Sequence, residues 1–401
     1  MLRARLNALW LSLGAFGGEL TLLLALPAIG RLYGAPAVAI LSIATVGANV
    51  GKLLGSLKVD AAIANADDAR VGATHAAAVA AIVATSAAAL LLFSALDGLS
   101  VLPAAAAAAG PVICGAFAGG AVQQASAMRL LRENRLGAFA LMKAFTSLML
   151  VAIVFGLRPG SLMTAYLLAN AATVLAAAAW HLRRPAPGGS GLATATRQEL
   201  RRARGFIVQG APAAALDGAN MFLLSVVTVW MAGAAVAGEA AQMQRIALGP
   251  SLAASLLLSQ HVWRQRFAPD DVGAWRRDAG VVARGAATAA ALSAAVLCGL
   301  LWTPPGRALV HSKPGDALGI VACLAPLLAQ YSVSASTVYF FKRERLHLYA
   351  RLQVTLLACL GAVAGLSLAT SDPALRVLLL LPLAGAILLL TATLARRAVI
   401  S

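Results

Sequence analysis

Long apolar stretches, separated by short polar connections, follow one another along the whole of this 401-residue chain. A helix needs about 20 apolar residues to cross a bilayer, and runs of this size can be drawn twelve times. They lie at about 7–30, 35–57, 72–96, 100–128, 136–157, 160–181, 206–232, 235–262, 280–303, 315–341, 347–370 and 374–395. The pattern predicts an all-α integral membrane protein with about 12 transmembrane helices.

The longest polar stretch, 183–204, is rich in proline and glycine and ends in the basic sequence RQELRRAR. Such a composition is typical of a flexible linker whose last part is helical. It predicts two six-helix bundles, at 1–182 and 205–401, joined by a cytoplasmic linker at 183–204.

A short internal repeat supports this division. The sequence RENRL at 132–136, followed by Ala140, resembles RERL at 343–346, followed by Ala350. Both copies fall between the fourth and fifth predicted spans of their half. Because six is an even number, both halves enter the membrane in the same direction, which predicts a parallel repeat of the kind found in transporters.

Basic residues are distributed unevenly between alternate connections. Of the 32 Lys and Arg residues, 23 lie on one set of connections, 5 on the other and 4 inside apolar stretches. Cytoplasmic loops carry the excess of positive charge in membrane proteins. The distribution therefore predicts that both termini are cytoplasmic.

Composition excludes several classes of function. Hydrophobic residues make up 60% of the chain and charged residues 12%, with a mean hydropathy of +0.82, which leaves no room for a sizeable soluble domain. The net charge of +17 lies mainly in short loops, where it meets anionic lipid headgroups, so we expect no nucleic-acid partner.

Motifs for enzymatic or metal chemistry are absent from the sequence. The cysteines and histidines show no metal-ligand spacing, and neither a Walker A sequence nor HExxH occurs. We expect no enzyme activity, no metal and no cofactor.

Two carboxylates fall inside predicted spans. Glu19 and Asp217 lie at comparable depth in the first span of each half, beside glycine or proline. Charges at membrane depth are costly and usually face the bundle interior or a wet cavity. The two acids could couple transport to H⁺ or Na⁺, or they could simply neutralise nearby bases such as Lys52 and Arg245.

Four cations also fall inside apolar stretches. Arg245 lies near the middle of the eighth predicted span, where its guanidinium needs an acid, carbonyl groups or an anionic ligand. Lys52, Lys143 and Arg351 lie closer to span ends, from which long side chains can reach the headgroups. Arg245, Lys52 and Lys143, with Gln244, are the candidate substrate-binding residues of a central cavity.

The segment Leu26–Val71 resembles the opening of the bacterial polysaccharide-export flippases, in which an RLY turn precedes a span and then a basic and acidic motif. This resemblance places four charged residues on a cytoplasmic loop of the family motif: Lys58, Asp60, Asp67 and Asp68. The chain departs from the motif with Lys in place of Arg at 58, Val in place of Tyr at 59, and Asp in place of Glu at 60.

Two further segments resemble the same family. QQASAMRLLRENRLGAFALMKA places Lys143 on the last basic position of one family segment. AQMQRIALGPSLAASLLLSQHVWRQR places Gln244, Arg245 and Pro250 on matching positions of another. The resemblance is to the polysaccharide and O-antigen flippases of the multidrug/oligosaccharidyl-lipid/polysaccharide exporter superfamily.

The resemblance implies a V-shaped pair of six-helix bundles in the bacterial inner membrane. It implies alternating-access translocation of an undecaprenyl-diphosphate-linked oligosaccharide, with that lipid-linked substrate and membrane lipids as partners. We expect a monomer. Two alternatives remain: a cation-coupled drug or metabolite antiporter on the same fold, and a membrane glycosyltransferase or ligase.

Overall fold

The computed structural model describes residues 35–99, 104–182, 192–268, 271–304 and 317–400, and, before residue 35, positions 10, 17, 18, 21, 22, 25, 28, 29 and 31–33. Every regular element within these residues is helical. The helices form two compact units, Met1–Ala211 and Pro212–Ser401. The predicted all-α fold class is thus confirmed.

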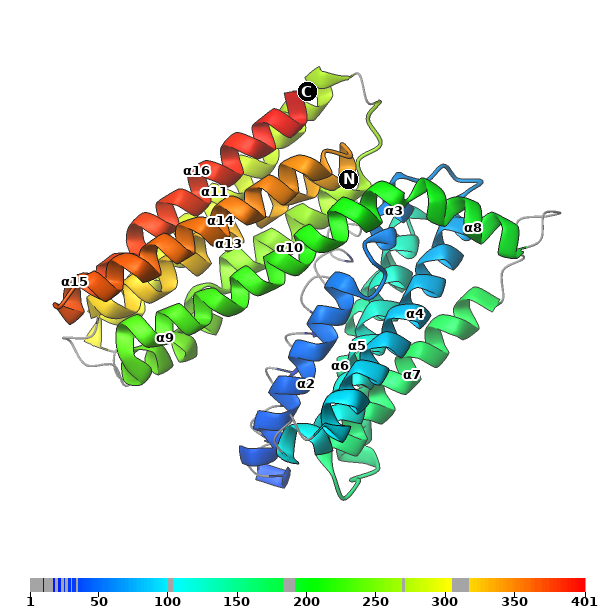
Figure 1. Cartoon of the computed structure of the whole chain (residues 1–401), viewed down its shortest axis with the longest axis horizontal. Coiled ribbons are helices and arrows are strands. Elements are labelled where there is room, and N and C mark those ends of the chain that lie inside the picture. The colour runs from blue at the N-terminus through cyan, green and yellow to red at the C-terminus, as the bar shows by residue number, and fades with distance from the viewer. Residues whose placement is uncertain are drawn as a thin grey trace. The chain divides into compact units, whose positions relative to one another are not determined.

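The first unit contains the helices α2 (Ala35–Leu54), α3 (Val59–Asn65), α4 (Val71–Gly98), α5 (Ala104–Arg132), α6 (Leu136–Gly156), α7 (Leu162–Leu182) and α8 (Leu192–Arg202), and the π-helical turn η1 (Phe206–Gly210) (Figure 1). Its core is made of small and branched apolar side chains; Ile29, Leu150 and Val154 are completely buried. Small side chains allow these helices to approach one another closely.

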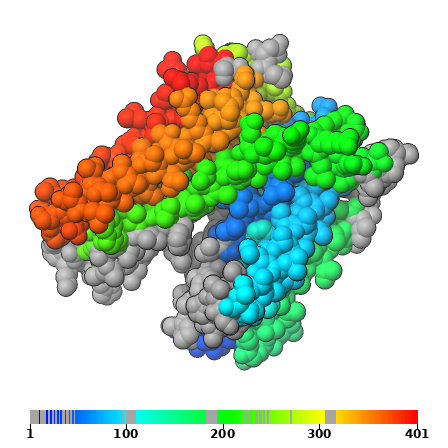
Figure 2. All heavy atoms as spheres, in the orientation of Figure 1, coloured from blue at the N-terminus to red at the C-terminus, as the bar shows by residue number. Residues whose placement is uncertain are grey.

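The second unit contains α9 (Ala211–Ala247), α10 (Gly249–Arg264), α11 (Val272–Trp302), α13 (Ala317–Lys342), α14 (Leu346–Ala369), α15 (Pro373–Leu378) and α16 (Leu380–Ile400). Its core clusters around Met243, Ile320 and Leu380, each completely buried. Figure 2 shows α14 (orange) beside α16 (red), two helices that are in contact along the unit.

Seven helical stretches among the described residues are long and apolar enough to cross a membrane. They are Val71–Ala95, Leu136–Gly156, Leu162–His181, Val272–Trp302, Ala317–Lys342, Leu346–Ala369 and Pro373–Ile400. All seven coincide with predicted spans. Their exposed side chains are largely apolar, as in Leu91, Leu175 and Leu389, which suits a lipid environment and not water.

Glycine fixes the contact between α2 and α5. Gly47, Gly51 and Gly55 follow one another at intervals of four, and therefore share one face of the α2 stretch and the turn after it. A Cβ added to Gly51 would overlap the Phe117 carbonyl, and one added to Gly120 would overlap the Ala48 carbonyl. Each helix thus presents glycine where the backbone of the other passes.

The repeated sequence forms the same turn in both units. Asn134, between α5 and α6, and Glu344, between α13 and α14, have left-handed backbones with φ of 58° and 54°. In each turn, the backbone N–H of the following residue donates to a carbonyl five residues earlier. Arg135 donates to the Leu130 carbonyl at 2.9 Å, and Arg345 donates to the Phe340 carbonyl at 2.7 Å. The short sequence repeat therefore marks two equivalent helical hairpins.

The structure differs from the predicted element boundaries in two places. A break was predicted at 233–234, between the seventh and eighth spans, whereas the helix assignment of α9 continues through these residues to Ala247. A second difference is the start of α11 at Val272, eight residues before the predicted ninth span. The helical end expected for the linker is present as α8 (Leu192–Arg202), which packs against α4 in the first unit.

Candidate functional site

A strained turn positions the first acidic side chain of the candidate site. Leu57 and Lys58, between α2 and α3, both have left-handed backbones, with φ of 50° and 65°. This conformation is unfavourable for side chains other than glycine and is concentrated at functional positions. It brings the Ser56 hydroxyl to the Asp60 carboxylate, to which it donates a hydrogen bond. Asp60, in the first turn of α3, is 3% exposed.

A glutamine connects this buried acid to a base on another helix. The Gln124 side chain of α5 donates from Nε2 to Asp60 Oδ2 at 3.4 Å. Its Oε1 accepts a hydrogen bond from Lys143 Nζ of α6 at 2.8 Å. Both ends of the Gln124 amide therefore form hydrogen bonds. We name the three connected side chains, Asp60, Gln124 and Lys143, the polar bridge.

A second glutamine fixes the helix that carries the lysine. Gln123 Nε2 donates to the Met142 and Lys143 carbonyls at 2.9 and 3.0 Å. Farther along α6, the Thr146 hydroxyl bonds to that of Thr173 on α7 at 2.8 Å. On α5, Gln123 thus positions the backbone of α6, and the adjacent Gln124 positions the Lys143 ammonium group.

The polar bridge lies inside the bundle. Gln124 is eight residues before the end of α5 and Lys143 seven residues after the start of α6. At about 1.5 Å per residue, both are roughly 10–12 Å from the helix ends. Charges at that depth are costly unless they are paired or hydrogen-bonded. The Gln124 amide provides hydrogen bonds to both charged groups of the bridge.

Two of the other charged residues of the family motif, Asp67 and Asp68, form ion pairs with arginines. Asp67 is exposed and lies 3.7 Å from Arg70, and Asp68 pairs with Arg132 at 2.9 Å. Arg132 also donates to the Ala66 carbonyl at 2.8 Å, which attaches this loop to the end of α5. Lys58 caps the start of α3 without a side-chain cap bond. Asp67 and Asp68, whose side chains are 82% and 81% exposed, thus form ion pairs at the surface of the unit.

A buried acid that the sequence did not single out attaches α8 to α4. Glu199 is 4% exposed and accepts two hydrogen bonds from Arg70, at 3.0 and 2.9 Å, and one from Arg202 at 2.7 Å. The Thr74 hydroxyl adds a bond at 3.0 Å. Burial alone would raise the pKa of Glu199, but the hydrogen bonds from Arg70, Arg202 and Thr74 outweigh it and lower that pKa.

The second unit places two of the predicted residues beside tyrosines. Asp217 of α9 accepts a hydrogen bond from the Tyr349 hydroxyl of α14 at 3.0 Å. Gln244 donates to the Tyr331 hydroxyl of α13 at 3.1 Å. One turn beyond Asp217, Asn220 donates to the side chain and carbonyl of Gln353, at 2.9 and 3.0 Å.

Within the first unit, the structure brings two of the predicted residues together. Asp60 and Lys143, predicted for different roles, share the polar bridge. Lys52 lies in the last turn of α2, half-buried, with Nζ 3.5 Å from Asn49 Oδ1. Glu19 and the side chain of Arg245 lie outside the described residues; the Arg245 backbone belongs to the last turn of α9.

Metal ligands do not gather anywhere in the described part of the chain: no three His, Cys, Asp or Glu side chains there could hold an ion together.

Sequence reasoning missed three polar residues of the first unit: Gln124, Ser56 and Glu199. The only local signal was the pair Gln123–Gln124 within an apolar stretch, where two amides need partners.

Solved structures resemble the chain over nearly its full length. One is a multidrug resistance MATE family transporter of the MOP superfamily in an outward-facing conformation, with 16% identity and a TM-score of 0.61, covering 98% of this chain and 93% of the other. A second is a MOP superfamily transporter from Pyrococcus furiosus, with 15% identity, a TM-score of 0.62 and coverages of 98% and 94%.

The MATE transporter ClbM in complex with Rb⁺ has 12% identity and a TM-score of 0.63, covering 98% of this chain and 93% of the other. No protein-family model and no curated protein matches the chain. At these identities the likeness establishes the fold alone. The chain is a multi-pass membrane protein with the fold, of about 12 helices, of the MOP-superfamily transporters; the narrower resemblance to polysaccharide flippases stays a prediction.

Proposed function

We propose that this chain is a membrane exporter that works by alternating access and is coupled to a cation gradient. The proposal rests on the fold, which resembles that of MOP-superfamily transporters over 98% of the polypeptide. Within this fold, hydrogen bonds through Gln124 link the buried acid Asp60 to the base Lys143. Asp60 is the acid that would gain and lose a proton or a monovalent cation. Gln124 would transmit that change to Lys143.

Two substrate classes fit this exporter. The likeness to solved multidrug and Rb⁺-bound transporters favours the first, an antiporter that exchanges a drug or metabolite for a cation. The segment Leu26–Val71 and the base Lys143 favour the second, an anionic undecaprenyl-diphosphate-linked oligosaccharide of the bacterial inner membrane. Coupling to H⁺ or Na⁺ through Asp60 is common to both.

Reconstituted protein distinguishes the two substrates. The full chain would be placed in liposomes with an imposed H⁺ or Na⁺ gradient. One assay follows efflux of ethidium, a cationic drug; the other follows flipping of a fluorescent undecaprenyl-diphosphate-linked sugar. Gradient-driven movement of one probe identifies the substrate class. Movement of neither probe under either gradient would overturn the proposal.

The coupling role of Asp60 has a matched control in the same loop region. Asp60→Asn removes the ionisable group from the buried position, whereas Asp67→Asn removes one from an exposed position seven residues later. We expect the first variant to lose at least about 90% of gradient-driven transport and the second to keep it. Equal transport by both variants would exclude Asp60 as the coupling group.

A further inference from the structure

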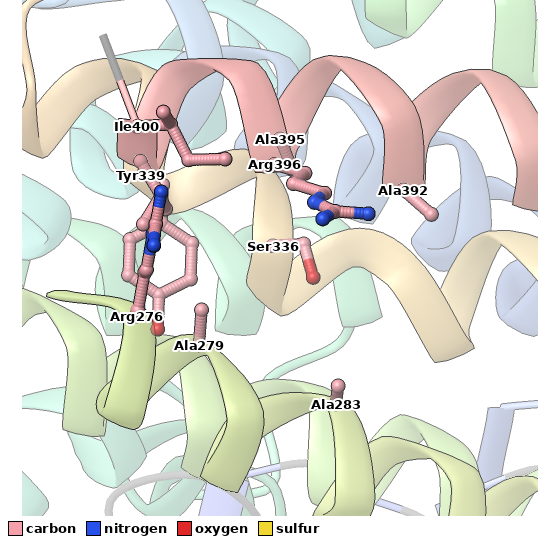
Figure 3. A pocket seen from close by; sticks show the side chains of 10 residues that line it. Arg276, Ala279, Ala283, Ser336, Tyr339, Ala392, Ala395, Arg396 and Ile400 are labelled. Atoms are coloured by element: carbon pink, nitrogen blue, oxygen red, sulfur yellow. The ribbon is translucent and has the colours of Figure 1, made fainter. Parts of the chain in front are cut away.

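An open pocket of about 400 Å³ lies within the second unit, between α11, α13 and α16 (Figure 3). Its size falls within the range of about 300–1,000 Å³ that is usual for small-ligand sites. Arg276 comes from α11, Ser336 and Tyr339 from α13, and Arg396 from α16. None of the described residues that line it is acidic. The pocket is therefore a positively charged recess between three helices.

The two arginines are close to the helix ends. Arg276 is in the second turn of α11, which follows a basic connection, and Arg396 is four residues before the end of α16. Figure 3 shows the Arg276 side chain in front of the Tyr339 ring and the Arg396 guanidinium near Ser336. The distribution of basic residues predicts that this is the cytoplasmic end of the unit, at the depth of the lipid headgroups.

The wall below the arginines is apolar. Ala283 is two turns deeper along α11 than Arg276, and Ala392 is one turn deeper along α16 than Arg396. These positions are about 10 and 6 Å farther from the helix ends. Charge at the rim and small apolar side chains below it match a molecule with a phosphate head and a hydrocarbon tail.

One side of the pocket, at the level of the arginines, is held rigidly. The Tyr339 hydroxyl donates to Asp278 Oδ2 at 2.8 Å, and Asp278 Oδ1 lies 2.8 Å from His261 Nε2. Both oxygens of this nearby acid are thus already engaged. Trp275 packs edge-on against the Tyr339 ring, with centroids 6.2 Å apart. The ring is therefore fixed in position to support whatever lies against it.

We infer that this pocket binds the headgroup of an anionic phospholipid, with Arg276 and Arg396 on the phosphate and an acyl chain along the alanine wall. Basic pockets between transmembrane helices at the cytoplasmic face recognise such headgroups, and arginine is suited to two-pronged phosphate contacts. The site is separate from the polar bridge, and the inference does not depend on the transported substrate.

Native mass spectrometry of the detergent-purified full chain tests the site, with phosphatidylglycerol as the probe and phosphatidylcholine as the neutral comparison. The variant Arg276→Gln/Arg396→Gln removes both pocket charges. Arg277→Gln/Arg397→Gln removes two charges from adjacent positions that do not line the pocket. We expect the pocket variant to lose about fivefold in phosphatidylglycerol affinity per arginine, and the control variant to change less than twofold.

Three outcomes would overturn the inference. Equal losses in the two double variants would show only general surface attraction, and equal binding of both lipids would show no headgroup recognition. Displacement of phosphatidylglycerol by millimolar inorganic phosphate would show a site for free phosphate. Thermal unfolding of each variant confirms that the protein compared is folded.

Discussion

At the scale of single residues, one side chain of the first unit links polar groups on two different helices. The amide nitrogen of Gln124 donates to Asp60, and its amide oxygen accepts from Lys143. A lysine or an aspartate alone could not do this, since each offers only donors or only acceptors when charged. An uncharged amide can link an acid to a base without adding a buried charge.

This arrangement predicts that Gln124→Leu destabilises the protein. Leucine fills a similar volume but removes a partner from both the Asp60 carboxylate and the Lys143 ammonium. Loss of a partner from a buried polar group costs about 1–3 kcal/mol. At about 2–4 °C per kcal/mol for a unit of this size, the melting temperature in detergent should fall by several degrees.

The control for this variant is Gln209→Leu, which makes the same chemical change at an exposed position of η1. We expect Gln209→Leu to melt within about 1 °C of the wild type, as surface substitutions usually do. If both variants melted at the same temperature, the bridge would have no stabilising role.

Sequence alone identified the ends of the bridge but not the bridge itself. Lys143 stood out because charge is rare in apolar stretches, and Asp60 because of the family resemblance, yet each was predicted for a different role. Gln124 is uncharged and is 64 positions from Asp60, so no local spacing connects them. Only the packing of α3 and α6 on α5 shows that the three side chains meet.

At the scale of helices, the apolar stretches correctly predicted where helices occur, but they predicted the ends of those helices less well. The predicted ends of α6 agree with the structure to within one residue. The break predicted at 233–234 is absent from the assignment of α9. The break followed from dividing this long apolar sequence into two spans of crossing length. Glycine costs only about 1 kcal/mol in a helix interior, which the apolar packing of Met231 and Ala240 can offset.

The helix α8 gives a pH-dependent prediction. The folded-state pKa of Glu199 is below its ordinary value of 4.5, because hydrogen bonds to Arg70, Arg202 and Thr74 outweigh burial. A lowered pKa stabilises the docked helix above pH 4.5, and this contribution is lost as the pH falls through the folded value. Between pH 5 and 8, docking through Glu199 should therefore not change with pH.

Hydrogen–deuterium exchange of residues 192–202, corrected for intrinsic rates, measures this docking. We expect Glu199→Gln to exchange at least about tenfold faster than the wild type at pH 7 and to show no further loosening at pH 4. Glu344→Gln, at an exposed turn of the second unit, should exchange in α8 as the wild type does. Wild-type protection that persisted unchanged at pH 3 would contradict the role of Glu199.

At the scale of the whole molecule, hydropathy and charge predicted the class of fold because the bilayer constrains a chain so strongly. Spanning backbone must satisfy its hydrogen bonds internally, which leaves helices as the only structure for such apolar runs. The substrate could not be predicted in the same way. It depends on a few side chains such as Arg245 and Glu19, and a fold of this kind accommodates different substrates.

The two equivalent hairpins predict the orientation of the chain in the membrane. If the halves are parallel repeats, Asn134 and Glu344 lie on the same, cytoplasmic side, whereas Gly160, after α6, lies on the opposite side. Single cysteines at these positions, in a chain whose four native cysteines are replaced, can be tested with a membrane-impermeant maleimide. In intact cells only Gly160→Cys should react; in inverted vesicles only Asn134→Cys and Glu344→Cys should. Opposite labelling of Asn134→Cys and Glu344→Cys would require an odd number of crossings between them and would exclude the parallel repeat.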